Sequence, residues 1–183
     1  MFNLANILTL SRILMIPLII GSFYISGPEG NWIGLGIFTL AGITDFFDGY
    51  LARKFNMMSK LGQFMDPIAD KLLIAATLMM MVAMQRIEGY AVLAAVIILV
   101  REFAVSGLRE FLAELKVSVP VSLLAKWKTT VQMFALCFLL VGEASPDMIP
   151  AVLIGTIGLW LAALLTLYTG YDYFKAGMRH MVE

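Results

Sequence analysis

Long apolar runs separated by short polar breaks constrain this chain more than any other feature. A helix of about 20 apolar residues is long enough to cross a bilayer. Six runs approach or exceed that length, at about residues 6–25, 31–52, 62–84, 90–112, 124–142 and 148–175. Backbone within lipid must form helices or a closed barrel, and no strand-like alternation is visible. The sequence therefore predicts an all-α fold.

Composition agrees with this interpretation. Hydrophobic residues make up 61% of the 183-residue chain, whereas about 45–50% is usual in soluble domains. The length leaves room for one domain. We therefore expect a polytopic integral membrane protein with six transmembrane helices in a single domain, residues 1–183. The net charge is zero, which gives no indication of nucleic-acid binding.

The basic residues predict the orientation. With a cytoplasmic amino terminus, only Arg86 of the 13 Lys and Arg residues lies on the outer side. Loops that face the cytoplasm are enriched in Lys and Arg. We therefore expect a multi-pass protein of the cell's inner (plasma) membrane, with both termini and any site near Arg53 on the cytoplasmic side.

Four aspartates interrupt this apolar sequence. Asp45 and Asp48 are spaced i, i+3, and Asp66 and Asp70 are spaced i, i+4, so each pair shares one face of a helix. Acidic side chains within membrane segments are costly and usually functional. The alternative is a buried acidic cluster that nearby Lys and Arg neutralise. Small residues between the pairs would let a bulky ligand approach the backbone; they are Gly49, Ala52 and Gly62.

This spacing resembles the signature of the CDP-alcohol phosphatidyltransferases, D-x2-D-G-x2-A-R-x8-G-x3-D-x3-D. All eight fixed positions are filled, by Asp45, Asp48, Gly49, Ala52, Arg53, Gly62, Asp66 and Asp70. The resemblance implies transfer of a phosphatidyl group from a CDP-linked lipid to an alcohol, with release of CMP. It also implies a homodimer.

The resemblance implies roles for individual residues. The metal ligands would be Asp45, Asp48 and Asp66, with Asp70 beside the metal as general base. The CDP-linked lipid would contact Asp48, Gly49, Ala52, Arg53, Gly62 and Asp66, with the planar fork of Arg53 on the pyrophosphate. The alternative for Arg53 is an interfacial arginine whose stem covers apolar surface.

The residue chemistry supports a metal independently of the resemblance. A pyrophosphate carries charge that must be neutralised, and two divalent ions about 4 Å apart can do this. The cluster offers carboxylate oxygens, and paired His or Cys residues that would favour zinc are missing from the sequence. We therefore expect two Mg²⁺ or Mn²⁺ ions.

Basic residues in the fourth and fifth runs suggest the acceptor. Arg101 and Arg109 are eight residues apart, within about 80° on a helical wheel. Arg101 lies too deep in its run to be a simple flanking charge. Together with Lys126 and Lys128, these residues predict a pocket for a phosphorylated alcohol. The alternative is positive-inside flanking combined with Arg–Glu pairs to Glu102 and Glu110.

Runs outside the signature resemble the branch of the family that uses glycerol 3-phosphate; they are residues 6–12, 101–103, 106–111, 119–122 and 126–133. Pro120 departs from that pattern. The resemblance implies CDP-diacylglycerol and glycerol 3-phosphate as substrates. The alternatives are a sister enzyme using inositol phosphate, serine or phosphatidylglycerol, a cation-coupled membrane transporter, and a non-catalytic scaffold.

Two local features remain open. Pro67 fits either the first turn of a helix or a kink within one. Gly30 and Gly34 form a G-x-x-x-G spacing at the edge of an expected loop, where it is weak support for helix packing.

Overall fold

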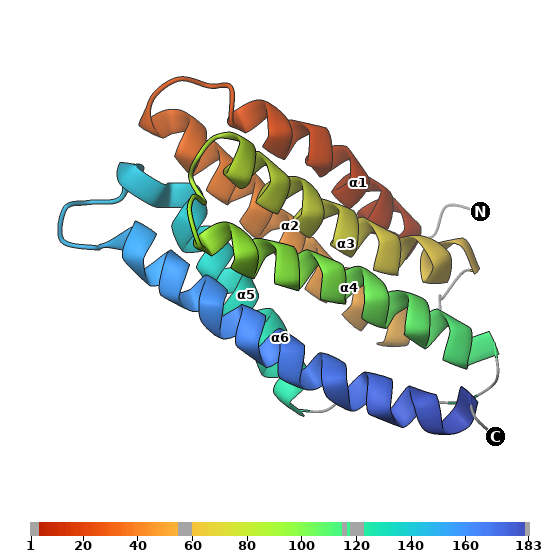
Figure 1. The fold of residues 1–183 in the computed structure, drawn as a ribbon. Coiled ribbons are helices and arrows are strands. Elements are labelled where there is room, and N and C mark those ends of the chain that lie inside the picture. The colour runs from red at the N-terminus through yellow and green to blue at the C-terminus, as the bar shows by residue number, and fades with distance from the viewer. Residues whose placement is uncertain (1–3, 55–59, 115–116, 118–122, 182–183) are drawn as a thin grey trace. The chain divides into compact units, whose positions relative to one another are not determined.

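Helices joined by short turns make up the structure (Figure 1). It is a computed structural model that describes residues 4–54, 60–114, 117 and 123–181. The elements are α1 (Leu4–Ser22), α2 (Pro28–Lys54), α3 (Lys60–Ala83), α4 (Ala91–Glu114), α5 (Leu123–Val141), the short 3₁₀ helix η1 (Gly142–Ala144) and α6 (Ala151–Met181). The all-α prediction is confirmed. Each apolar run coincides with one α-helix to within a few residues, except that α6 continues to Met181, beyond the predicted end at residue 175.

Three helical segments in the described part of the chain are long and apolar enough to cross a membrane: Ala91–Ala113, Leu123–Ala144 and Ala151–Lys175. The apolar part of α1, Thr9–Ser22, is shorter. The remaining helices, α2 and α3, contain the motif aspartates, which lower their hydropathy. The chain is thus a multi-pass membrane protein, and the count of six spans stays a prediction.

The helices fall into two compact units, and the first comprises Met1–Arg86 and Leu140–Ala151. Within it, α1 packs against both α2 and α3 (Figure 1). Gly30 and Gly34 make the approach of α2 to the end of α1 possible. A Cβ atom at Gly34 would lie 2.8 Å from Oγ of Ser22, and one at Gly30 would lie 2.5 Å from the Ile25 carbonyl oxygen. The spacing that looked weak in the sequence is therefore a packing contact.

Arg86 ties together the turns at one end of this unit. Its guanidinium donates to the Leu140 carbonyl oxygen at 3.0 Å and to Oδ1 of Asn31 at 2.6 Å. It also lies over the Phe23 ring, 4.7 Å from the centroid. Asn31 in turn donates to the Val141 carbonyl oxygen at 2.7 Å. Burial lowers the pKa of the Arg86 guanidinium because it disfavours the charged form.

The second unit comprises Ile87–Leu139 and Val152–Glu183. Here α6 packs against α5 through two glycines. A Cβ atom at Gly158 would lie 2.9 Å from that of Ala135, and one at Gly155 would lie 2.7 Å from Cγ of Leu139. Small residues of this kind let helices approach closely within a membrane. An apolar cluster joins α4 to α6; it contains Val105, Leu108, Leu112 and Tyr173.

Candidate active site

Arg12, on α1, is fully buried and pairs with two of the four motif aspartates. Its Nη2 atom lies 2.9 Å from Oδ1 of Asp45 on α2, and its Nη1 atom lies 2.5 Å from Oδ1 of Asp70 on α3. The two aspartate side chains remain 46% and 45% exposed. Because both carboxylates reach one guanidinium, the two halves of the motif converge in space.

Thr9 makes the second contact from α1. Its buried hydroxyl donates a hydrogen bond to Oδ1 of Asp66. Thr9 and Arg12 are spaced i, i+3 and therefore share one face of α1. That face touches three of the four aspartates, which places α1 beside the carboxylates of α2 and α3.

The structure locates the other motif residues only in part. Gly62 is buried on α3. The remaining positions belong to α2, and their side chains lie outside the described part of the structure; they are Asp48, Gly49, Ala52 and Arg53. Pro120, the departure noted in the sequence, also lies outside the described residues.

Pro67 lies inside α3, because that helix begins at Lys60. The mid-helix alternative is therefore the correct one, and the first-turn alternative is excluded. Proline supplies no backbone N–H and its ring crowds the preceding turn. The regular hydrogen-bonding pattern of α3 is thus interrupted directly beside Asp66 and three residues before Asp70.

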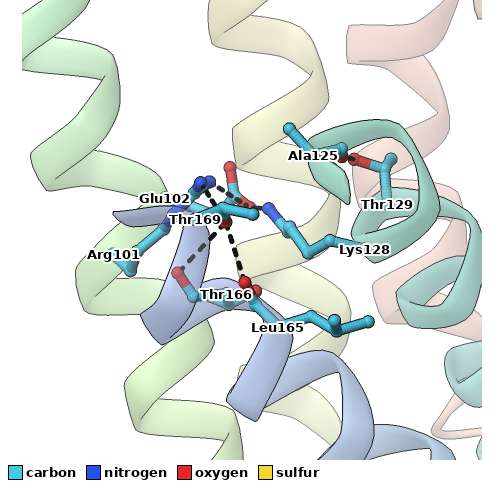
Figure 2. Close-up of polar contacts among 8 residues, drawn as sticks. All are labelled: Arg101, Glu102, Ala125, Lys128, Thr129, Leu165, Thr166 and Thr169. Carbon is cyan, nitrogen blue, oxygen red and sulfur yellow. Dashed lines mark hydrogen bonds and ion pairs between the residues drawn. The ribbon is translucent and has the colours of Figure 1, made fainter. Parts of the chain in front are cut away.

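In the second unit, two of the four predicted basic residues gather around Glu102 (Figure 2). Lys128 on α5 is buried and pairs with the Glu102 carboxylate on α4. Arg101 lies 3.7 Å from the same carboxylate and donates to the Thr169 hydroxyl on α6 at 2.8 Å. Its guanidinium is also 5.9 Å from the centroid of the Tyr173 ring. The pair of Arg101 with Glu102 is one that the sequence left open as an alternative, whereas the pair of Lys128 with Glu102 was not predicted.

The other two basic residues are placed differently. Arg109 and Lys126 are exposed on α4 and α5. Within the described residues of the second unit, three buried polar atoms have no hydrogen-bond partner: Nε of Arg101, Oε1 of Gln132 and Oγ1 of Thr166. Buried polar atoms are normally paired. The surroundings of Arg101 and Lys128 thus retain capacity for further polar contacts.

Comparison with known proteins agrees with the motif. The model of the CDP-alcohol phosphatidyltransferase family matches residues 2–168. The chain belongs to this family. Proteins named CDP-diacylglycerol–glycerol-3-phosphate 3-phosphatidyltransferase from Rickettsia bellii and Rickettsia felis are 53% and 52% identical to it, over 95% of this chain and 94% of their own. A protein of the same name from Haemophilus influenzae is 36% identical over 100% of this chain and 97% of its own.

The family is known to use a divalent metal, and the donors of this chain suit one. Asp45, Asp66 and Asp70 supply only carboxylate oxygens, which hard cations prefer. Among the described contacts, these three carboxylates meet one guanidinium, that of Arg12, and one hydroxyl, that of Thr9. No group of three or more His, Cys, Asp or Glu side chains is close enough to hold a metal within the described residues, a set that excludes the side chain of Asp48.

Sequence reasoning gave no site role to Thr9 or Arg12. Both belong to the run at residues 6–12 that resembles the family, and Arg12 was counted only as a cytoplasmic-side charge. A signal was nevertheless present, because an arginine inside an apolar helix needs a partner. Which carboxylate it pairs with depends on the packing of three helices, which the sequence does not display.

Proposed function

We propose that this member of the family transfers the phosphatidyl group of CDP-diacylglycerol to glycerol 3-phosphate. The products are phosphatidylglycerophosphate and CMP. The observation that carries this proposal is the similarity to enzymes of that name, 52–53% identical over 95% of the chain. The convergence of Asp45 and Asp70 on Arg12 supports the proposal, because it brings the two halves of the signature together.

In the proposed reaction, Asp70 accepts the proton of an alcohol hydroxyl of glycerol 3-phosphate. The hydroxyl oxygen forms a bond to the phosphorus that carries the diacylglycerol. The bond from that phosphorus to the bridging oxygen breaks, and CMP leaves with the electron pair. General-base assistance of this kind contributes about 10²- to 10⁴-fold in rate. The half-exposed side chain of Asp70 is accessible for such a transfer.

The four aspartates would hold two Mg²⁺ or Mn²⁺ ions, and these ions would neutralise charge on the pyrophosphate and the leaving phosphate. The ligands are Asp45, Asp48, Asp66 and Asp70. Arg53 would bind pyrophosphate oxygens, while Gly49, Ala52 and Gly62 would leave room for the nucleotide. The excess of carboxylates over cations around Arg12 supports this assignment.

The acceptor phosphate would bind near Arg101 and Lys128, with Arg109 and Lys126 as further contacts. Arg101 and Lys128 share one carboxylate, that of Glu102, so one positive charge remains in excess. The Nε atom of Arg101 is a buried donor without a partner among the described residues. A phosphate would supply both an acceptor and the missing negative charge.

The membrane arrangement belongs to the same proposal. Six spans in one domain, a cytoplasmic site at the inner membrane and a homodimer follow from the charge distribution and the family resemblance. Both substrates could then meet at the membrane surface, the lipid from the bilayer and the sugar phosphate from the cytoplasm.

One assay tests the proposed reaction. Purified protein in detergent is given CDP-diacylglycerol and, in separate reactions, glycerol 3-phosphate, inositol phosphate, serine or phosphatidylglycerol, and CMP release is measured. We expect release with glycerol 3-phosphate at a rate well above the others. Faster release with another alcohol would assign the chain to a sister activity, and no release with any alcohol would remove the proposal.

Metal dependence gives a second test. We expect turnover to be lost after dialysis against EDTA and restored by Mg²⁺ or Mn²⁺, because the donor set contains only carboxylates. Ca²⁺ is the control ion, because it binds similar oxygen ligands at longer distances and in a less regular geometry. Full turnover in excess EDTA would contradict the metal assignment.

A further inference from the structure

One face of α1, which lies outside the family signature, contacts three of the four motif aspartates. Arg12 bridges Asp45 and Asp70, and Thr9 binds Asp66. These contacts connect α1 to both α2 and α3. The aspartates are half-exposed, whereas Thr9 and Arg12 are buried. Thr9 and Arg12 are therefore more deeply buried than the carboxylates that they contact.

Carboxylates from separate helices repel one another unless a cation lies between them. A guanidinium is suited to this position because its nitrogens form a rigid planar fork. Arg12 uses both terminal nitrogens, one for each aspartate. It thereby fixes the directions of Asp45 and Asp70 as well as neutralising part of their charge.

Thr9 fixes the third carboxylate in a different way. Its hydroxyl bonds Asp66, which belongs to the same helix as Asp70 but lies before Pro67. The proline removes a backbone donor at this point of α3. The hydrogen bond from Thr9 fixes the Asp66 carboxylate from outside its own helix.

We propose that Thr9 and Arg12 are positioning residues that set the geometry of Asp45, Asp66 and Asp70 for divalent metal. The proposal rests on the metal role assigned to these aspartates under the proposed function. A carboxylate has two oxygens with about four lone-pair sites, so a contact to α1 leaves it able to bind a cation. Partners that orient metal ligands are commonly worth 10- to 100-fold in metal affinity or activity.

Mn²⁺ binding to the purified, substrate-free protein tests this role without reference to turnover. Free Mn²⁺ is followed by electron paramagnetic resonance in a titration of wild-type protein, Thr9→Val and Arg12→Gln. We expect the dissociation constant to rise about tenfold or more in each variant. Thr9→Ser retains the hydroxyl and should bind as wild type does. Arg12→Lys keeps the charge without the fork and should recover part of the loss.

Two matched controls separate positioning from a general loss of structure. Thr156 is exposed and its hydroxyl bonds the Val152 carbonyl oxygen of its own helix, so Thr156→Val should leave Mn²⁺ affinity unchanged. Arg86→Gln removes a guanidinium that contacts carbonyl and amide oxygens and an aromatic ring, and it should also leave Mn²⁺ affinity unchanged.

The outcomes are distinct. Unchanged or tighter Mn²⁺ binding in both Thr9→Val and Arg12→Gln would overturn the positioning role, and tighter binding would show that Arg12 competes with the metal. If Arg12→Gln does not fold, the near-isosteric Thr9→Val and its serine partner still decide the question. If wild-type protein binds no Mn²⁺, the metal assignment itself fails and the positioning role fails with it.

Discussion

The cluster around Arg12 and the cluster around Lys128 use similar side chains with opposite excess charge. In the first unit, Arg12 and Thr9 contact Asp45, Asp66 and Asp70. Arg12 thus pairs with two carboxylates, and the Thr9 hydroxyl binds the third. In the second unit, Arg101 and Lys128 share the carboxylate of Glu102, and Thr169 binds Arg101. Carboxylates predominate among the described contacts of the first cluster, and cations predominate among those of the second.

The sign of the predominant charge indicates which kind of ligand each cluster could bind. A buried charge without a partner is costly. This cost applies to the buried Lys128, whereas Asp45 and Asp70 are half-exposed. The carboxylate excess therefore suits metal ions, and the cation excess suits a phosphate. Arg86 provides a reference for both, because its contacts are two neutral oxygens and an aromatic ring.

The most severe test of the comparison is Asp70→Asn. The amide keeps the shape of the side chain but cannot accept the alcohol proton, so kcat should fall by about 10²- to 10⁴-fold. Binding of CDP-diacylglycerol should remain largely intact. Asp172→Asn on α6 is the matched control, since Asp172 is exposed. CMP release at near wild-type rate in Asp70→Asn would show that the base is another group.

A smaller effect is expected in the second cluster. Lys128→Gln should raise the KM for glycerol 3-phosphate by about 10- to 100-fold, because a charge-assisted hydrogen bond is worth about 1.5–3 kcal/mol. The KM for CDP-diacylglycerol should stay constant. The exposed Lys175 gives the matched control Lys175→Gln. Kinetics with each substrate varied in turn separate the two constants.

Other outcomes for Lys128→Gln would break the comparison. A raised KM for CDP-diacylglycerol alone would assign the cluster to the donor. Lower thermal stability with both constants unchanged would mean that Lys128 and Glu102 form a structural pair.

Sequence was sufficient for the helices, and the chemistry predicted for the four aspartates stays a prediction. Apolar runs predict membrane helices because the bilayer imposes both their length and their hydrogen bonding. The aspartate spacing predicts a shared helix face for each pair. The end of α6 was missed because a helix can continue beyond its apolar stretch, here to Met181, where hydropathy gives no signal.

Contacts between helices could not be predicted in the same way. The bridge from Arg12 to Asp45 and Asp70 joins residues 33 and 58 positions apart (45 − 12 and 70 − 12), and only packing brings them together. The same holds for Lys128, which the sequence assigned to a pocket without identifying Glu102 as its actual partner. Residue type and spacing indicate what a cluster can bind, whereas packing decides which of its members meet.

Arg86→Gln gives the smallest expected effect. It tests the comparison at an arginine whose described contacts are uncharged groups. Arg86 donates to the Leu140 carbonyl oxygen and to Asn31, and Asn31 donates to the Val141 carbonyl oxygen. These carbonyls end α5, where a cation is also favoured by the helix dipole. Glutamine has no planar guanidinium and cannot donate to both acceptors. The free energy of unfolding should therefore fall by about 1–3 kcal/mol.

Thermal unfolding in detergent measures this loss, and Arg86→Lys should recover part of it because the charge near the end of α5 remains. Mn²⁺ affinity and both KM values should not change, since none of the contacts of Arg86 described above involves a carboxylate. This pattern is the opposite of that expected for Arg12→Gln, which should weaken Mn²⁺ binding. If Arg86→Gln weakened Mn²⁺ binding as strongly, the two arginines would not differ in role, and the contacts of Arg12 with carboxylates would not explain the effect of Arg12→Gln.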